Sequence, residues 1–154
     1  MKMTRFVTMM SSAAVLLSAL VSCTGHNTLT KQEKEEGWKL LFDGKTLDGW
    51  RDYNGDSLTV PWHVVDGCIQ AKGTGDDASG YIVTDRQYEN FILSWDWKLS
   101  KGGNSGMLYH VVERPEFKVP YVTGPEYQLI DVPNFPEELQ PWQKLGVDYA
   151  MYLP

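Results

Sequence analysis

The stretch Phe91-Ile-Leu-Ser-Trp-Asp-Trp-Lys-Leu99 limits most strongly what this chain can fold into. Its odd-numbered positions are all large and apolar, whereas its even-numbered positions include Ser94, Asp96 and Lys98. Alternation with a period of two residues is typical of a β-strand with one buried face. A second layer must cover such a face, so we expect the strand to line the interior of a β-sandwich. The polar face is either plain solvent exposure or the floor of a concave site.

Short strand signals separated by turn-forming pairs recur from Gly37 onward, with no internal repeat and no long amphipathic helix. Asp66-Gly67 favours a type I′ hairpin turn, and Cys68 after it is expected to pack as a small buried hydrophobe. The pattern predicts one all-β domain. The expected strands are Trp38–Phe42, Trp62–Val65, Cys68–Ala71, Tyr81–Val83, Phe91–Leu99, Gly106–Val112 and Glu126–Ile130.

The first residues resemble a targeting signal rather than part of a fold. Lys2 and Arg5 precede an apolar run at 15–21, and Leu20-Val-Ser-Cys23 resembles the lipobox of bacterial lipoproteins. We therefore predict a lipoprotein signal peptide at 1–22 and a polar tether at 23–36 that is lipid-anchored through Cys23. The expected location is the bacterial cell envelope. The alternative is a soluble secreted protein in which Cys23 is incidental.

The charge balance argues against a nucleic-acid partner. Residues 1–22 hold two basic residues and no acidic ones, so 12 basic and 20 acidic residues remain after them. Nucleic-acid binding needs a basic surface, which this balance does not provide. A neutral sugar would need no such charge.

A polar pair on the strand predicted after Gly124-Pro125 is the main candidate site. Glu126 and Gln128 share a strand face because they are two residues apart. A carboxylate beside a carboxamide is suited to holding and acting on a polyhydroxylated ligand. The predicted domain at 37–154 is nevertheless short for a β-sandwich, and we expect its fold to be incomplete at the C-terminal side.

These segments together resemble the 3-keto-disaccharide hydrolase family, formerly a domain of unknown function, in their residues and their order. The resemblance covers nearly all of the chain after the tether. The matching stretches are Gly37-Trp-Lys-Leu-Leu-Phe-Asp-Gly-Lys-Thr-Leu-Asp-Gly-Trp50, Trp62-His-Val-Val-Asp-Gly-Cys-Ile69, Tyr81-Ile-Val-Thr-Asp85, Phe91-Ile-Leu-Ser-Trp-Asp-Trp-Lys98, Gly103-Asn-Ser-Gly-Met-Leu108 and Glu126-Tyr-Gln-Leu-Ile-Asp131.

The resemblance implies a jelly-roll β-sandwich of the concanavalin A-like lectin/glucanase type, with a ligand site on the concave sheet. It also implies an enzyme of sugar-degrading bacteria that cleaves glycosides already oxidised at C3. The chain departs from the family where Asp96 and Lys98 replace a frequent Glu and Arg, and where His110 stands near the place of an Arg. It also stops before the family's closing segments.

A 3-keto group acidifies the proton on C2, so the expected chemistry needs a base there and donors for an enolate-like oxygen. Glu126 is the predicted base, because desolvation can raise the pKa of a carboxylate toward neutrality. His110 is the alternative acid or base, or else a satisfied core or rim histidine. Lys98, positioned by Asp96, is predicted to stabilise negative charge; otherwise the two form a surface ion pair.

Four further side chains are predicted to bind the sugar, each with a structural alternative. Asn104 serves either a sugar hydroxyl or the preceding turn, and Asp131 either a ligand or an Asx turn. Gln128 is a hydrogen-bonding candidate, and Tyr149 is suited to stacking on a sugar ring. No cofactor is predicted, since nothing in the spacing resembles a defined metal site; a divalent ion is the minority alternative.

The sequence therefore predicts a hydrolase or lyase of 3-keto-glycosides that works by base-assisted deprotonation at C2. A sugar 3-oxidoreductase is expected upstream, because the keto substrate must first be made. The alternative is a non-catalytic carbohydrate-binding module, since a fold does not determine a function.

Overall fold

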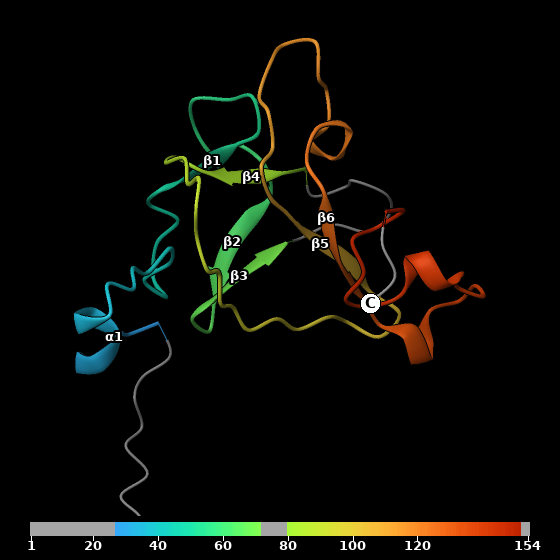
Figure 1. Ribbon diagram of the computed structural model, residues 1–154, viewed down its shortest axis with the longest axis horizontal. Helices are drawn as coiled ribbons and strands as arrows, with labels where there is room; N and C mark the ends of the chain where they lie inside the picture. Colours follow the sequence, from blue (N-terminus) through green and yellow to red (C-terminus); the bar gives the residue numbers. More distant parts are fainter. Residues whose placement is uncertain (1–26, 72–79, 152–154) are drawn as a thin grey trace, which may run out of the picture.

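The computed structural model describes residues 27–71 and 80–151 of the chain (Figure 1). The signal peptide and Cys23 predicted above lie outside these residues. Short strands dominate the described part, and its helical content is one five-residue α-helix and three 3-10 turns, so the all-β prediction is confirmed. The elements are α1 (Lys31–Glu35), β1 (Trp50–Asp52), β2 (Trp62–Val65), β3 (Cys68–Ala71), β4 (Ile82–Thr84), β5 (Asn104–Leu108), η1 (Pro120–Val122), β6 (Glu126–Ile130), η2 (Val132–Asn134) and η3 (Pro141–Gln143).

The six described strands form three antiparallel pairs: β1 with β4, β2 with β3, and β5 with β6. The β2–β3 pair is the predicted hairpin. Asp66 and Gly67 have φ angles of 50° and 73°, which a type I′ turn requires at both central positions. Val65 therefore pairs with Cys68 across a two-residue loop. Here the local sequence was sufficient to fix both the turn and the register.

The packed interior is centred on β6. One edge of β6 pairs with β5, and the other is hydrogen-bonded to residues 146–149 through an isolated antiparallel bridge between Tyr127 and Asp148. Leu129, Ile130 and Val147 are almost fully buried, at 6%, 2% and 1% exposed. β6 is therefore hydrogen-bonded along both of its edges.

Two predicted strands are wrong. Residues 38–42 and 91–99 are not part of any sheet of the described residues, and the second segment keeps the predicted alternation only in part. Leu93, Trp95 and Leu99 are half-buried as expected, but Phe91 and Trp97 are exposed at 43% and 45%. A ladder also needs a neighbouring backbone, and none of the described residues supplies one.

The strand predicted at 106–112 is shorter, since β5 ends at Leu108. Tyr109 N–H still donates to the carbonyl of Pro125 at 3.1 Å, but His110 has a φ of 52°, in the left-handed region that ends a strand. Cys68 is exposed rather than buried, because it lies at the start of β3 opposite the exposed Val65.

Part of the predicted tether is ordered against the domain. Thr30 caps α1 through a capping box with Glu33, in which each side chain satisfies a backbone N–H of the other residue. Before the helix, Asn27 Nδ2 donates to the carbonyl of Gly67 in the β2–β3 turn at 2.8 Å. Among the described residues there is no helix both long and apolar enough to cross a bilayer.

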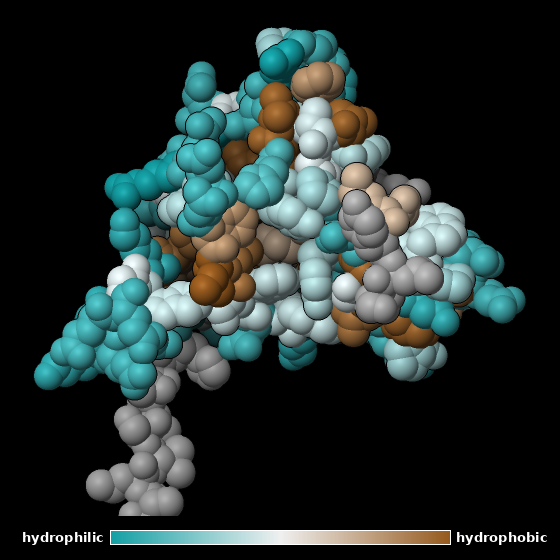
Figure 2. All heavy atoms as spheres, viewed as in Figure 1, coloured by the Kyte–Doolittle hydropathy of each residue, from teal (hydrophilic) through white to brown (hydrophobic). Residues whose placement is uncertain are grey.

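Several large apolar side chains reach the surface. Figure 2 shows apolar groups lying among polar ones on the viewed face, with the polar residues of the N-terminal helical region grouped at one side. The most exposed are Ile92 at 81%, Met151 at 62% and Val122 at 57%. The buried core of the described residues is therefore small and lies mainly along β6.

Candidate functional site

The carboxylate of Glu126 lies directly over Gly106 of the neighbouring strand. Glu126 pairs with Leu108, and Gly106 pairs with Gln128, so these residues occupy one face of the β5–β6 pair. The Glu126 side chain extends along that face toward Gly106, where its Cδ is 2.5 Å from the position that a Cβ would take. The predicted base is therefore held flat against the sheet and is half-buried.

The same face carries three other predicted site residues. Asn104 is exposed at the start of β5 and pairs with Ile130. Tyr149 N–H donates to the carbonyl of Glu126 at 2.9 Å, which makes the two residues neighbours across the β6 edge. Gln128 is only 2% exposed, and its Oε1 has no hydrogen-bond partner among the described residues. Gln128 therefore lies on the Glu126 face as predicted, but its side chain is buried there rather than exposed.

Trp142 was not singled out by the sequence, although it contacts a predicted binding residue. The ring centroids of Trp142 and Tyr149 lie 5.3 Å apart in an edge-on arrangement, and Trp142 is 40% exposed. The carbonyl of Trp142 also accepts a hydrogen bond from the N–H of Ala150. The two rings provide an aromatic surface next to the strand that carries Glu126. In the sequence, Trp142 could have been recognised as an aromatic residue directly after Pro141, the proline that opens a 3-10 turn.

Asp96 and Lys98 lie in the segment 91–99, which contacts β6 through Trp95. The ring of Trp95 packs edge-on against Tyr127 at 5.5 Å, and Tyr127 faces away from the Glu126 side of β6. This contact places Trp95 against the opposite face of the sheet, and Asp96 and Lys98 are exposed. Their predicted roles beside Glu126 stay predictions.

His110 is placed by its backbone rather than by the strand alternation. Its positive φ interrupts β5, and its ring lies 5.6 Å from Phe91 and 5.7 Å from Tyr109. The structure thus gives His110 an exposed position beside two aromatic rings, and its role as acid or base stays a prediction.

The carboxylate of Asp131 is engaged within the fold, but not in the Asx turn that the sequence offered as the alternative, because Pro133 has no backbone N–H to donate to it. Its Oδ2 accepts the N–H of Gly102 at 2.9 Å, and Asn134 Nδ2 donates to both carboxylate oxygens at 3.1 and 2.9 Å. These bonds join the turn before β5 to the 3-10 turn after β6. The carboxylate of Asp131 therefore holds two turns together.

The shortest ion pair of the described residues was not predicted from the sequence. Two nitrogens of Arg51 donate to the two carboxylate oxygens of Glu113, each at 2.6 Å, and Asn54 N–H donates to Glu113 Oε1 at 2.8 Å. The hydrogen bonds from Arg51 hold the pKa of Glu113 below its usual value, although burial opposes them. The pair ties β1 to the loop that follows β5, across 62 positions of sequence that no local pattern connects.

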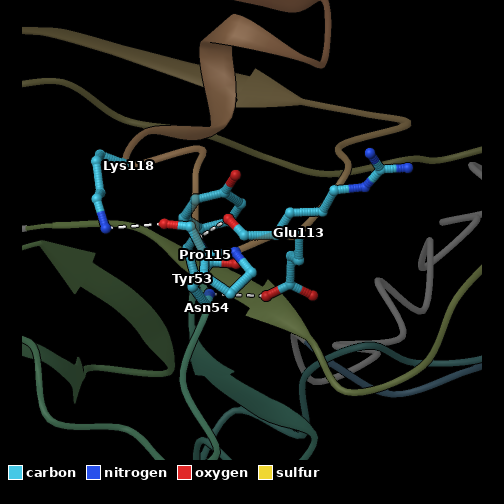
Figure 3. A pocket seen from close by; sticks show the side chains of 6 residues that line it. Tyr53, Asn54, Glu113, Pro115 and Lys118 are labelled. Atoms are coloured by element: carbon cyan, nitrogen blue, oxygen red, sulfur yellow. Dashed lines mark hydrogen bonds between the residues drawn. The ribbon is translucent and has the colours of Figure 1, made fainter.

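An open hollow of about 510 Å³ lies next to this ion pair and not at Glu126. Figure 3 shows that its polar groups are turned toward one another: Lys118 Nζ donates to the carbonyl of Pro115, and Asn54 N–H to Glu113. Asn54 Nδ2 also donates to two loop carbonyls. These contacts stabilise the loop, so the hollow is a poor candidate for the catalytic site. Within the described residues, no group of three or more His, Cys, Asp and Glu side chains is arranged to hold a metal ion.

Residues 37–153 match the family profile of the 3-keto-alpha-glucoside-1,2-lyase-like domain. The chain belongs to this family. The match covers the whole described domain after α1, and the family predicted from the sequence is thereby confirmed. The lyase-like domain includes β5 and β6, with Glu126, Gly106 and Tyr149.

Two curated proteins are similar to this lyase-like domain. A 3-keto-disaccharide hydrolase from Bacteroides thetaiotaomicron is 33% identical over 151 residues, which are 90% of this chain and 50% of the relative. A polygalacturonase from Phaedon cochleariae is 26% identical over 140 residues, which are 84% of this chain and 33% of the relative. The chain spans half or less of the length of these relatives.

A solved structure supports the fold. The crystal structure of a candidate glycosyl hydrolase from Parabacteroides distasonis superposes with a TM-score of 0.76 and 50% sequence identity, covering 83% of this chain and 60% of that one. Identity at this level with a shared fold agrees with the jelly-roll sandwich that the sequence predicted for the lyase-like domain.

Proposed function

We propose that this domain cleaves 3-keto-glycosides, with Glu126 as the base that removes the proton on C2. The observation that carries the proposal is the carboxylate of Glu126 seated over Gly106 on an ordered strand pair. Membership of the lyase-like family and the similarity to a 3-keto-disaccharide hydrolase support the type of substrate.

The chemistry requires few groups. Glu126 takes the C2 proton, and the electrons of that C–H bond form an enolate with the C3 oxygen. When the ketone re-forms, the C1–C2 double bond forms and the C1–O bond breaks, so the aglycone leaves with its electron pair and is then protonated. Addition of water across the new double bond gives the hydrolysed 3-keto sugar. Positioned general-base catalysis of this kind contributes about 10²–10⁴-fold in rate.

An aromatic pair beside Glu126 and a carboxamide further along the same sheet face suit a sugar ring. The Trp142–Tyr149 pair presents an aromatic surface beside the β6 edge, and Asn104 is an exposed carboxamide on the Glu126 face. Aromatic faces and amide groups are common partners of C–H-rich, hydroxylated ligands. We propose that these residues orient the ring so that C2 faces Glu126.

Replacing Glu126 with Gln tests the proposal. Sugar release from an aryl 3-keto-α-glucoside should fall by about 10²-fold or more, because an amide cannot accept the C2 proton. Glu137→Gln is the matched control, since Glu137 is exposed and the change is the same. Turnover by Glu126→Gln equal to that of the control would rule out Glu126 as the base.

Two further measurements separate the alternatives. A substrate with deuterium at C2 should react more slowly than the protiated one if removal of that proton limits the rate. Equal rates together with no exchange of the C2 proton into solvent would argue against deprotonation. If the unaltered chain binds the sugar and releases no product, it is a carbohydrate-binding module.

We also propose that the protein is lipid-anchored in the bacterial cell envelope and receives its substrate from a sugar 3-oxidoreductase. The lipobox-like Leu20-Val-Ser-Cys23 supports the anchor, and the keto group of the substrate demands the oxidation. Cys23→Ala should move the protein from the membrane to the soluble fraction of the expressing bacterium. A Cys23→Ala protein that remains in the membrane fraction would contradict the anchor.

A further inference from the structure

Gly106 is an unusual choice for the middle of a strand. Glycine weakens a strand interior because its backbone loses more freedom on folding and it has no side chain to pack. Gly106 is not among the residues with positive φ, so its backbone conformation does not demand glycine. If glycine is required at position 106, the reason must be that there is no space for a side chain there.

The space at Gly106 is filled by Glu126. A Cβ at position 106 would lie 2.5 Å from Glu126 Cδ and 2.6 Å from Glu126 Cγ, and closer still to Oε1. Separations under 3 Å between such atoms are essentially never found. Three consecutive side-chain atoms of Glu126 thus occupy the volume that any other residue at position 106 would need.

The strand register explains why glycine matters here. The direct partner of Glu126 is Leu108, and Gly106 lies one pair further along the same face. The Glu126 side chain can follow the sheet only because nothing projects from position 106. A side chain there would force the carboxylate to leave the sheet and change its direction.

We propose that Gly106 is a positioning residue, which places the carboxylate of Glu126 for proton removal by leaving its path along the sheet open. The proposal rests on the proposed function of Glu126. The proposal gives a structural reason for the position of the base. That position matters because a misplacement of about 1 Å can cost about 10²-fold in rate.

Gly106→Ala is the direct test. The methyl group should displace the carboxylate and lower kcat on the aryl 3-keto-α-glucoside by about 10²-fold, with KM changed much less, because a shift of about 1 Å can cost that much in rate. Ser105→Ala is the matched control, since it lies next to Gly106 but faces the other side of the sheet. It should retain nearly full activity.

Double variants separate positioning from a general structural effect. Adding Gly106→Ala to Glu126→Gln should cause no further loss of activity, because the displaced group is no longer a base. Glu126→Asp shortens the side chain by one methylene, so Gly106→Ala should cost less in that background than in the natural chain. Equal losses from Gly106→Ala in all three backgrounds would overturn the proposal.

A stability cycle tests the steric part without any activity. Gly106→Ala should lower Tm by roughly 4 °C when Glu126 is present, since it overpacks the strand pair. The same substitution should leave Tm unchanged or raise it in the Glu126→Ala background, where the volume is empty. If Gly106→Ala alone does not fold, the double variant must fold for the proposal to stand.

The two kinds of failure are distinguishable. An inactive natural chain whose Tm values still show coupling between positions 106 and 126 would refute the proposed function and keep the steric contact. An active chain whose activity and Tm show no coupling would refute the role of Gly106 alone.

Discussion

Glu113 and Glu126 are both half-buried carboxylates near the ends of β5 and β6, yet their surroundings differ in kind. Glu113 is gripped by the two guanidinium nitrogens of Arg51 and by a backbone N–H, which lower its pKa. Glu126 lies along a strand pair over a glycine, within a regular ladder. The contacts of Glu113 hold a loop in place, whereas the Glu126 side chain lies along the strand pair and directs its carboxylate toward Gly106.

The comparison shows that the role of an acidic residue can be inferred only together with the groups that surround its carboxylate. A carboxylate held ionised by a bidentate cation is a weak base, so Glu113 is unsuited to proton removal despite the hollow beside it (Figure 3). The absence of a side chain at Gly106, by contrast, leaves open the path along the sheet that the Glu126 side chain takes.

The largest expected difference between the two residues is in stability. Glu113→Gln should lower the free energy of unfolding by about 2 kcal/mol, because an amide cannot offer two charged acceptors to Arg51. Glu126→Gln keeps the shape that packs on Gly106, so its cost should stay below about 1 kcal/mol. Urea denaturation followed by tryptophan fluorescence measures both.

Glu116→Gln is the control for this measurement, since Glu116 is exposed and lies 3.9 Å from Arg114 in a surface ion pair. It should change stability by less than about 0.5 kcal/mol. If Glu126→Gln lost as much stability as Glu113→Gln, the contrast between a carboxylate with a structural role and one with a catalytic role would be contradicted.

A smaller difference in the free energy of unfolding should appear only at acidic pH. The folded-state pKa of Glu113 lies below its ordinary value of 4.5, chiefly through the hydrogen bonds from Arg51. Its stabilisation is therefore complete above pH 4.5 and is lost as the pH falls through the folded-state pKa. The gap in unfolding free energy between the natural chain and Glu113→Gln should be constant near neutrality and close below pH 4.5.

Taking the difference between two chains cancels the other carboxylates that respond to acid. Asp43 and Glu33 also have lowered pKa values, from backbone hydrogen bonds in a turn and at a helix cap, and they are present in both chains. A gap that stays constant down to pH 3, or that widens in acid, would show that Glu113 does not draw stability from its charged form.

Local patterns predicted some elements well. Asp66-Gly67 determined its hairpin because two positive φ angles in succession suit few other pairs. Alternation correctly placed Glu126 and Gln128 on one face of β6, and it identified three of the five expected inward residues of 91–99, since Phe91 and Trp97 are exposed. It could not tell that 91–99 pairs with no strand of the described residues, because a periodic pattern does not specify a hydrogen-bonding neighbour.

The candidate site, like the fold, could be predicted from the sequence only in part. The sequence was sufficient to place Glu126 on its strand face, and Gly106 carried a readable signal, since a glycine inside a strand often marks a close approach. The packing of Trp95 against Tyr127 could not be predicted, because it is a contact between distant positions.

The sequence by itself determined the all-β class, the family, the β2–β3 hairpin and the strand face on which Glu126 lies. Each of these depends on neighbours in the chain or on a serial order of motifs. The tertiary structure alone decided that Glu126 rests on Gly106, that Arg51 grips Glu113, and that Gln128 is buried. The physical reason is that these contacts join strands whose pairing is chosen by packing the whole domain, so no local stretch of residues encodes them.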